Sequence, residues 1–149
     1  MGKKQRKSGR NVVTQFKVSE AAALLGVSDD TVRRWADTGR IELITSGTGP
    51  AVIDGAQLAA VAQELAKDSA LAQAFPASRA SARNRITGIV TKVTKDRVMA
   101  QVEMQAGPFR IVSLMSTEAA DELGLEPGSL AVASVKATTV VIETPDIHK

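Results

Sequence analysis

The chain has 149 residues with a formal net charge of +3, and 44% of the residues are hydrophobic. This composition suits one globular domain or two small ones. There is no cysteine and a single histidine, His148, which excludes disulfides, thiolate metal sites, His-based catalytic triads and His-cluster metal sites. No apolar run reaches the roughly 18 residues of a membrane span. We therefore expect a cytoplasmic protein with no membrane contact and no metal site.

The positive charge is concentrated near the N-terminus. Residues 1–40 hold nine Lys and Arg residues against four acidic ones, so the remainder of the chain is net negative. Such an excess predicts a polyanionic partner, with Lys3 and Lys4 of the basic stretch 1–11 contacting phosphates. A solubilising tail is the alternative interpretation of this stretch.

Residues 18–38 have the pattern of two short helices joined by a tight turn. Ser19 is the expected N-cap of the first helix, and Gly26 ends it. Ser28 caps the second helix, which Gly39 ends. Val32, Trp35 and Ala36 form the apolar stripe of this second helix. The pair has the form of a helix-turn-helix.

A short β-hairpin, or wing, is predicted next. Ile41, Leu43 and Thr45 alternate, "SGTGP" is a turn, and "AVI" is a short second strand. Asp54 and Gln57 have the D-x-x-Q spacing of a capping box before a third helix. The buried stripe of that helix is expected to comprise Leu58, Val61, Ala62 and Leu65.

The segment "LGVSDDTVRRWADTGRI" resembles the winged helix-turn-helix of MerR-type and phage-excisionase-type proteins, and the resemblance extends over residues 14–66. It implies DNA binding with the second helix in the major groove. The residues that would contact DNA are Thr31, Arg33, Arg34 and Thr38. An alternative is that Arg33 and Arg34 form helix-surface ion pairs with Asp29 and Asp30. The wing "TSGTGPA" also lacks the basic residue usual at the wing tip in this family.

From residue 85 the apolar pattern has a period of two. Three strands are predicted, with turns near Lys95-Asp96 and at Gly107-Pro108, and with Val98, Ala100, Val102 and Met104 facing inward. Residues 116–125 read as a helix with Ser116 as N-cap, "EPGS" is a turn, and "LAVASVKATTVVIET" supplies one or two further strands. Five short strands with a helix after the third suggest a small OB-like barrel.

Residues 80–144 resemble the molbindin (Mop) domain of the TOBE group. The resemblance lies in three segments in order, "SARNRITGIV", "LMSTEAADELGLEPGS" and "VASVKATTVVI". It implies a site for molybdate or tungstate at a subunit interface. The corresponding residues here are Ser81, Ala82, Arg83, Ser116, Lys136, Ala137 and Thr138. The family often has Ser after this Lys, whereas this chain has Ala137, so one hydroxyl is lost or shifted.

The residue types suit a tetrahedral dianion, which at neutral pH only accepts hydrogen bonds. Ser81 offers a hydroxyl, Arg83 a fixed fork of N–H groups and Lys136 an ammonium. Backbone N–H groups of Ala82, Ala137 and the helix start at Ser116 add donors. Asn84 is expected to hold the loop instead of the ligand. A solvated strand edge is the alternative for Arg83, and protection of an edge against aggregation is the alternative for Lys136.

The sequence thus predicts a two-domain α+β protein, a small winged helix-turn-helix followed by an OB-like five-stranded β-barrel of the Mop/TOBE type. The expected divisions are a basic tail over 1–11, a DNA-binding domain over 12–66, a linker over 67–79 and an oxyanion-binding domain over 80–145. The expected function is that of a molybdate-responsive, DNA-binding transcriptional regulator, acting as a homo-oligomer (dimer or hexamer). A molybdate or tungstate storage protein, whose helix-turn-helix mediates protein contacts, is the alternative. No nucleophile–base pair points to an enzyme.

Overall fold

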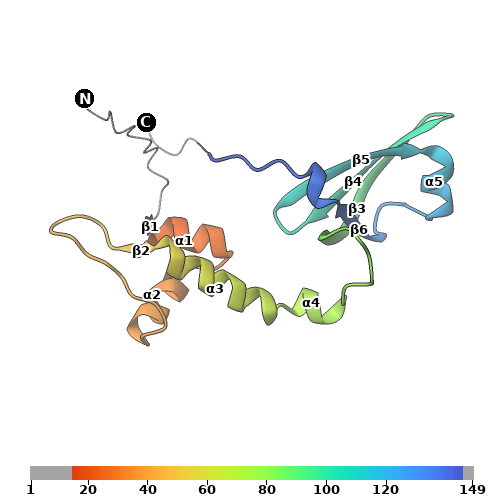
Figure 1. The fold of residues 1–149 in the computed structure, drawn as a ribbon. Coiled ribbons are helices and arrows are strands. Elements are labelled where there is room, and N and C mark those ends of the chain that lie inside the picture. The colour runs from red at the N-terminus through yellow and green to blue at the C-terminus, as the bar shows by residue number, and fades with distance from the viewer. Residues whose placement is uncertain (1–14, 146–149) are drawn as a thin grey trace, which may run out of the picture. The chain divides into compact units, whose positions relative to one another are not determined.

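The computed structural model describes residues 15–145 (Figure 1). The chain divides into two compact units between Ser69 and Ala70. None of the helices in the described part of the chain combines the length and hydropathy of a membrane span.

The first unit contains the predicted helix-turn-helix. Helix α1 spans Val18–Leu25, and Gly26 follows it in the left-handed conformation (φ 68°) that closes the helix. Helix α2 spans Asp29–Asp37, and the Ser28 hydroxyl accepts a hydrogen bond from the Thr31 N–H at 3.2 Å, as predicted for its N-cap.

The predicted N-cap of α1 is wrong. The helix begins at Val18, with Lys17 in the N-cap position, so Ser19 lies inside the first turn. The Lys17 N–H donates to a carboxylate oxygen of Glu20 at 2.8 Å. Glu20 therefore satisfies the helix start from within the helix, and a serine cap is not needed.

The wing is less regular than predicted. Val52 and Ile44 form a single β-bridge, and the predicted second strand, β2 (Val52–Asp54), pairs in antiparallel fashion with β1 (Gln15–Lys17). The sequence analysis missed β1, whose partner lies more than 30 residues away. The loop over 45–51 is therefore closed by a single β-bridge, and the wing is not a regular two-stranded hairpin.

Helix α3 (Gly55–Lys67) completes the first unit. Asp54 Oδ2 accepts from the N–H groups of Ala56 (3.1 Å) and Gln57 (3.4 Å), so half of the predicted capping box is present. Ala62 was predicted to be buried but is exposed. The buried stripe of α3 runs through Leu58 and Val61, and Ala62 lies beside it. The core of the unit consists of Val18, Ala21, Ala22, Val32, Ile41, Ile53, Leu58 and Val61, against which Trp35, Ala36 and Leu65 pack.

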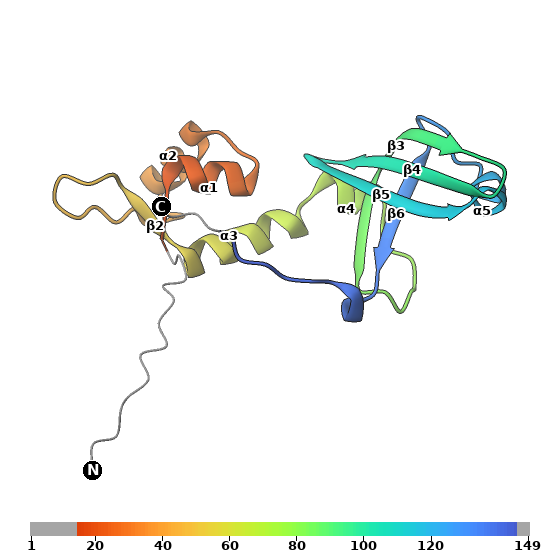
Figure 2. The same cartoon turned by 90° about the horizontal axis from the view of Figure 1, so that it is seen from above.

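The second unit begins with a short helix, α4 (Ala70–Ala74), inside the segment predicted as linker. Its main body is an antiparallel sheet in the order β5-β4-β3-β6 (Figure 2). The element bounds are β3 Asn84–Lys95, β4 Met99–Ala106, β5 Phe109–Ser116, α5 Thr117–Glu122, β6 Leu130–Val135 and the 3-10 turn η1 Ala137–Thr139.

Strand β3 is long and serves two partners. Its first half, from Asn84 to Ile89, pairs with β6, and its second half, from Ile89 to Lys95, pairs with β4. The register with β4 shifts between Val90 and Lys92, which is a β-bulge, and bulges bend and twist the strand that carries them. The four strands therefore curl instead of lying flat.

Inward-facing side chains of the curled sheet form the second core. Its buried members are Val90, Ala100, Val102, Met104 and Ala106 of the sheet, together with Ala120 of helix α5. Val98 was predicted to belong to this set, but it is 69% exposed. It lies in the turn before β4, where Asp96 Oδ1 accepts from the N–H groups of Val98 and Met99, each at 2.7 Å.

Two further expectations for this unit need correction. Helix α5 ends at Glu122, because Gly124 has a left-handed backbone (φ 62°) and turns the chain towards β6. The predicted fifth strand is absent among the described residues, since residues 140–145 pair with no other strand. Among the described residues, the second unit is therefore a four-stranded half-barrel, and the five-stranded OB-like barrel is not confirmed.

Gly88 lies on β3 close to the backbone of β4. A Cβ atom at this position would overlap the Gln105 carbonyl oxygen and lie 2.8 Å from Met104 Cε. We predict that Gly88→Ala lowers the free energy of unfolding by about 1–3 kcal/mol, as overpacking typically does. Thermal melting of the variant checks this, with Thr87→Ala as the control. Equal melting of Gly88→Ala and wild type would contradict it.

The turn at Asp96 should make stability depend on pH. Hydrogen bonds from the Met99 and Val98 N–H groups hold the pKa of Asp96 below its ordinary value. A lowered carboxyl pKa stabilises the fold above the ordinary value near 3.9, and this stabilisation is lost as the pH falls through the lowered pKa. We predict that Asp96→Asn melts below wild type at about pH 6 and that the gap narrows at about pH 2.5. The exposed Glu118, as Glu118→Gln, is the control. A gap that does not change with pH would show that the charge is irrelevant to the turn.

Candidate functional sites

Two of the predicted anion-binding segments lie side by side at one end of the half-barrel. Asn84 at the start of β3 is in register with Val135 at the end of β6, and the Asn84 Nδ2 donates to the Val135 carbonyl oxygen at 3.1 Å. Asn84 thus holds the loop, as expected. Residues 81–83, which precede β3, and residues 136–138, which follow β6, are thereby brought together.

The backbone after β6 is fixed by a side chain that the sequence analysis did not single out. The Thr139 hydroxyl and the Thr139 N–H both donate to the Lys136 carbonyl oxygen, at 2.9 Å and 3.0 Å. These hydrogen bonds stabilise the 3-10 turn η1 directly after Lys136. The Lys136, Ala137 and Thr138 side chains are all exposed.

Two positively charged side chains at this end of the sheet are not neutralised by ion pairs within the described residues. Arg83 and Lys136 are exposed, and neither forms an ion pair within the described residues. The three carboxylates that form ion pairs within the described residues, those of Glu64, Glu103 and Asp121, are bound to other cations. A group that only accepts hydrogen bonds would find donors here and no competing carboxylate contact.

Ser116 is the predicted site residue that the single chain does not bring to this place. It ends β5, is in register with Met99, and caps α5 by accepting from the Ala119 N–H at 3.1 Å. Met99 follows the far end of β3, whose 12 residues span up to roughly 35 Å at the usual rise per residue. Ser116 and Arg83 of one chain therefore lie at opposite ends of β3.

The predicted DNA-contacting residues of α2 share an exposed surface. Arg34 Nη2 donates to Thr31 Oγ1 at 3.4 Å, and Thr31 Oγ1 shares a 2.9 Å hydrogen bond with Ser28 Oγ. The Thr38 hydroxyl donates to the Trp35 carbonyl oxygen at 3.2 Å and so is bonded to the helix end. Lys3 and Lys4 lie outside the described residues.

The alternative of helix-surface ion pairs does not hold for α2. Within the described residues, Arg33 and Arg34 make no ion pair, although Asp29 and Asp30 stand four residues before them. Both guanidinium groups are exposed. They therefore remain available to an external acceptor.

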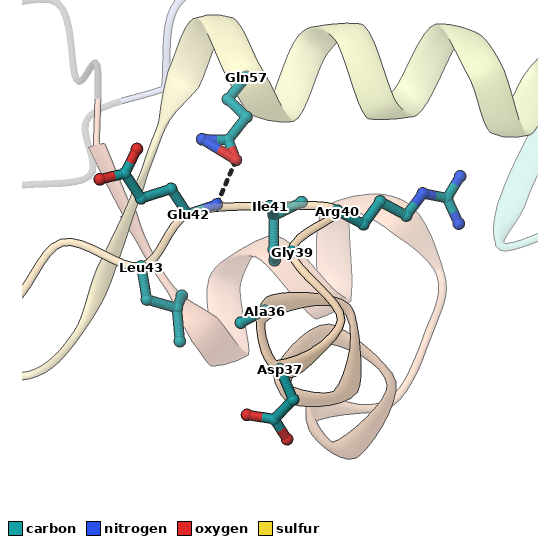
Figure 3. A pocket seen from close by; sticks show the side chains of 8 residues that line it. All are labelled: Ala36, Asp37, Gly39, Arg40, Ile41, Glu42, Leu43 and Gln57. Carbon is teal, nitrogen blue, oxygen red and sulfur yellow. Dashed lines mark hydrogen bonds between the residues drawn. The ribbon is translucent and has the colours of Figure 1, made fainter.

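A shallow depression of about 620 Å³ lies between the end of α2 and the base of the wing (Figure 3). Gln57 reaches into it from α3, and its Oε1 accepts from the Glu42 N–H at 2.6 Å. The D-x-x-Q pattern identified Gln57 as polar and structural but assigned it the wrong partner. Here Gln57 fixes the extended segment that leads into the wing, so α3 positions the wing base.

Arg40 was also missed by the sequence analysis. Its guanidinium carbon lies 4.7 Å from the centre of the Trp35 ring, and its Nη2 lies 3.4 Å from Glu64 Oε2. Trp35 is half-buried against the core, as predicted, and it also offers Arg40 a ring face. Cation–π contacts depend on tertiary placement, so no local sequence signal announced this one.

Comparison with known families identifies the two units. A helix-turn-helix domain model matches residues 16–65, and a TOBE domain model matches residues 80–142. The "Molybdenum-pterin-binding protein 2" of Clostridium pasteurianum is 40% identical over 63 residues, which are 42% of this chain and 93% of that protein. The chain belongs to the TOBE-domain family. It joins a TOBE domain to a helix-turn-helix domain.

Two further similarities cover a similar share of the chain. The "Molybdenum transport protein ModE" of Herbaspirillum seropedicae is 39% identical over 67 residues, 44% of this chain, but the chain spans only 25% of the length of that protein. The solved structure of a molybdate-binding protein from Sporomusa ovata covers 45% of this chain and 100% of its own, with 28% identity and a TM-score of 0.43. All these relatives match about the length of the TOBE domain.

Proposed function

We propose that the chain is a molybdate-responsive, DNA-binding transcriptional regulator. One observation carries the proposal: the TOBE domain gathers Ser81–Arg83 and Lys136–Thr138 at one end of the sheet, and the same chain holds a helix-turn-helix with exposed arginines on its second helix. The related proteins are named for molybdenum transport, molybdenum-pterin binding and molybdate binding, which supports molybdate as the ligand.

The anion would be held by donors alone. The Arg83 guanidinium and the Lys136 ammonium supply positive charge, and the Ser81 hydroxyl and the backbone N–H groups of Ala82 and Ala137 supply neutral donors. With Ala137 after Lys136, the free hydroxyl of this segment is that of Thr138, because the Thr139 hydroxyl is bonded to the backbone. Ser116 would join this set only from another subunit, since its own chain places it at the far end of β3.

The same donor set would favour tetrahedral anions that carry no proton over those that carry one. Molybdate and tungstate are unprotonated dianions near neutral pH, whereas phosphate carries a proton that must be donated to an acceptor. Within the described residues no carboxylate is paired with Arg83 or Lys136 to act as that acceptor. Sulfate is also unprotonated, so only the size of the site would reject it. Molybdate and tungstate are too alike in size and charge for this chemistry to separate.

Helix α2 would enter the major groove, as the second helix of a helix-turn-helix does. Arg34 would read a base edge or contact a phosphate, Arg33 and Thr31 would flank it, and the basic residues Lys3 and Lys4 would add phosphate contacts. One helix-turn-helix reads only a half-site, so a dimer or a larger symmetric assembly is implied. Anion binding would then change the geometry or the stability of that assembly, and thereby its fit to DNA.

A storage or buffering protein for molybdate or tungstate is the second candidate. The exposed Asp29 and Asp30 in the first turn of α2 oppose a DNA phosphate at that position. The wing has a single β-bridge, and its residues 43–51 include no Lys or Arg. In this alternative the helix-turn-helix mediates protein contacts. A gel shift with and without molybdate separates the two candidates, because only the regulator changes its DNA affinity with the anion.

Binding of an anion to this site should raise the melting temperature of the protein. A ligand that binds only the folded protein stabilises it by about 2.7 kcal/mol at a hundredfold excess over its Kd. We predict that molybdate raises the melting temperature of the full chain and that phosphate at equal concentration raises it far less. Arg83→Ala and Lys136→Ala should each remove the molybdate shift and leave the anion-free melting temperature nearly unchanged, because exposed donors contribute little to the empty fold.

The matched control is Arg97→Ala, which removes an exposed arginine in the turn after β3. This variant should keep the molybdate shift in full. The opposite pattern, in which Arg83→Ala lowers the anion-free melting temperature sharply and keeps the shift, would make Arg83 a structural residue.

Sequence discrimination on DNA should depend on Arg34. A base-reading arginine contributes about 1–3 kcal/mol at one position, whereas a phosphate contact acts uniformly. We predict that Arg34→Ala relaxes discrimination at one base pair, measured by competition among single-base variants of a duplex selected from a random pool. Lys67→Ala, at the end of α3, should leave discrimination intact. Unchanged discrimination in Arg34→Ala would limit its role to the helix surface.

A further inference from the structure

The two peptide groups that flank the Cα atom of Lys136 are both held through their carbonyl oxygens. The Val135 carbonyl oxygen accepts from Asn84 Nδ2 at 3.1 Å. The Lys136 carbonyl oxygen accepts from the Thr139 hydroxyl at 2.9 Å and from the Thr139 N–H at 3.0 Å. A carbonyl oxygen has two lone pairs, so Thr139 occupies both lone pairs of the Lys136 carbonyl.

The bonds from Thr139 also determine the direction of the Ala137 N–H, which belongs to the same peptide group as the Lys136 carbonyl. The C=O and N–H groups of a trans peptide point in opposite directions, and the described part of the chain contains no cis peptide bond. Because the Lys136 carbonyl points into the η1 turn, the Ala137 N–H points away from it. Among the hydrogen bonds of the described residues, none is donated by the Ala137 N–H.

This orientation suits a ligand that only accepts hydrogen bonds. Such a ligand is attracted by an N–H group and repelled by a carbonyl oxygen. Residue 137 is an alanine, so its N–H is the only hydrogen-bond donor that it offers beside the Lys136 ammonium. A donor that is already fixed in direction loses less conformational freedom when the ligand binds. The affinity of the site should therefore depend on what holds this peptide group in place.

We propose that Thr139 is a positioning residue of the anion site. Its hydroxyl fixes the peptide group between Lys136 and Ala137 with the carbonyl turned inward and the N–H turned towards the anion, and it does not touch the anion itself. Asn84 holds the preceding peptide group in the same manner. The inference rests on the proposed function, because it concerns the same anion site and names a residue outside the set of ligand contacts.

Titration calorimetry with sodium molybdate on the full chain tests the role of Thr139. Thr139→Val removes the hydroxyl, keeps the size of the side chain and leaves the backbone N–H bond in place. We expect its Kd for molybdate to rise about three- to tenfold, the range that corresponds to the loss of one hydrogen bond. Thr139→Ser, which restores a hydroxyl, should bring the Kd back close to that of wild type. All titrations are made well below the melting temperature of each variant.

The matched control is Thr91→Val. The exposed Thr91 hydroxyl donates to the Glu103 carbonyl oxygen at 3.3 Å, so this substitution also removes a hydrogen bond from a threonine to the backbone. Thr91 lies in the second half of β3, away from residues 136–138. Thr91→Val should keep the wild-type Kd for molybdate, whatever its effect on the melting temperature. The comparison separates positioning of the anion donors from a general loss of stability.

An NMR measurement reports on the peptide group directly. In the full chain labelled with ¹⁵N-alanine, the amide signal of Ala137 is identified by its loss in Ala137→Gly. This signal should move when molybdate is added to wild type or to Thr139→Ser. In Thr139→Val the same movement should require about three- to tenfold more molybdate, in step with the calorimetric Kd.

Three results would overturn the inference while leaving the proposed function in place. The first is a wild-type Kd in Thr139→Val, or a raised Kd that Thr139→Ser does not restore. The second is an equal loss of affinity in Thr91→Val. The third is an Ala137 amide signal that stays unmoved while molybdate binds. Absence of molybdate binding by wild type is a different outcome, because it contradicts the proposed function and the inference with it.

Discussion

The second unit depends on a single constraint, which is that one strand must pair with two different partners. Strand β3 pairs with β6 along its first half and with β4 along its second, and the bulge between Val90 and Lys92 lets it turn from one to the other. Gly88 lies shortly before this bulge. Only a glycine fits there, because a Cβ atom would overlap the Gln105 carbonyl oxygen. The antiparallel pairing of β3 with β6 places the start of β3 and the end of β6 at the same end of the sheet. The candidate anion residues are neighbours as a result.

Local signals predicted the helices well. Ser28 and Gly26 act within a few residues of their own positions, so the caps and turns that they form can be read from sequence. Some errors were local, such as the Ser19 cap, and others arose where the partner was distant. Strand β1 has only three residues, and no local pattern revealed that it pairs with β2. Gln57 had the correct spacing for a capping box, but its oxygen is taken by the Glu42 N–H, 15 residues away.

The candidate sites show the same limit. Arg83 and Lys136 were selected by resemblance to a family, and composition alone would have left them as solvated edge residues. Their proximity arises from strand pairing across some 50 residues, which no local period encodes. The β-branched residues after Thr139 did indicate a strand, but a strand also requires a neighbour. The strand predicted over this segment is not formed, because the described chain offers residues 140–145 no pairing.

The η1 turn has a consequence for how the protein would respond to its surroundings. Lys136, Ala137 and Thr138 carry candidate anion contacts, and the segment over 140–145 starts directly behind them. When an anion binds across subunits, as proposed for this site, anion binding and assembly are thermodynamically linked, and each alters the equilibrium constant of the other by the same factor. Occupancy by the anion would then depend on the concentration of the protein itself. Such a protein would report the abundance of its ligand relative to its own abundance, and not the ligand concentration alone.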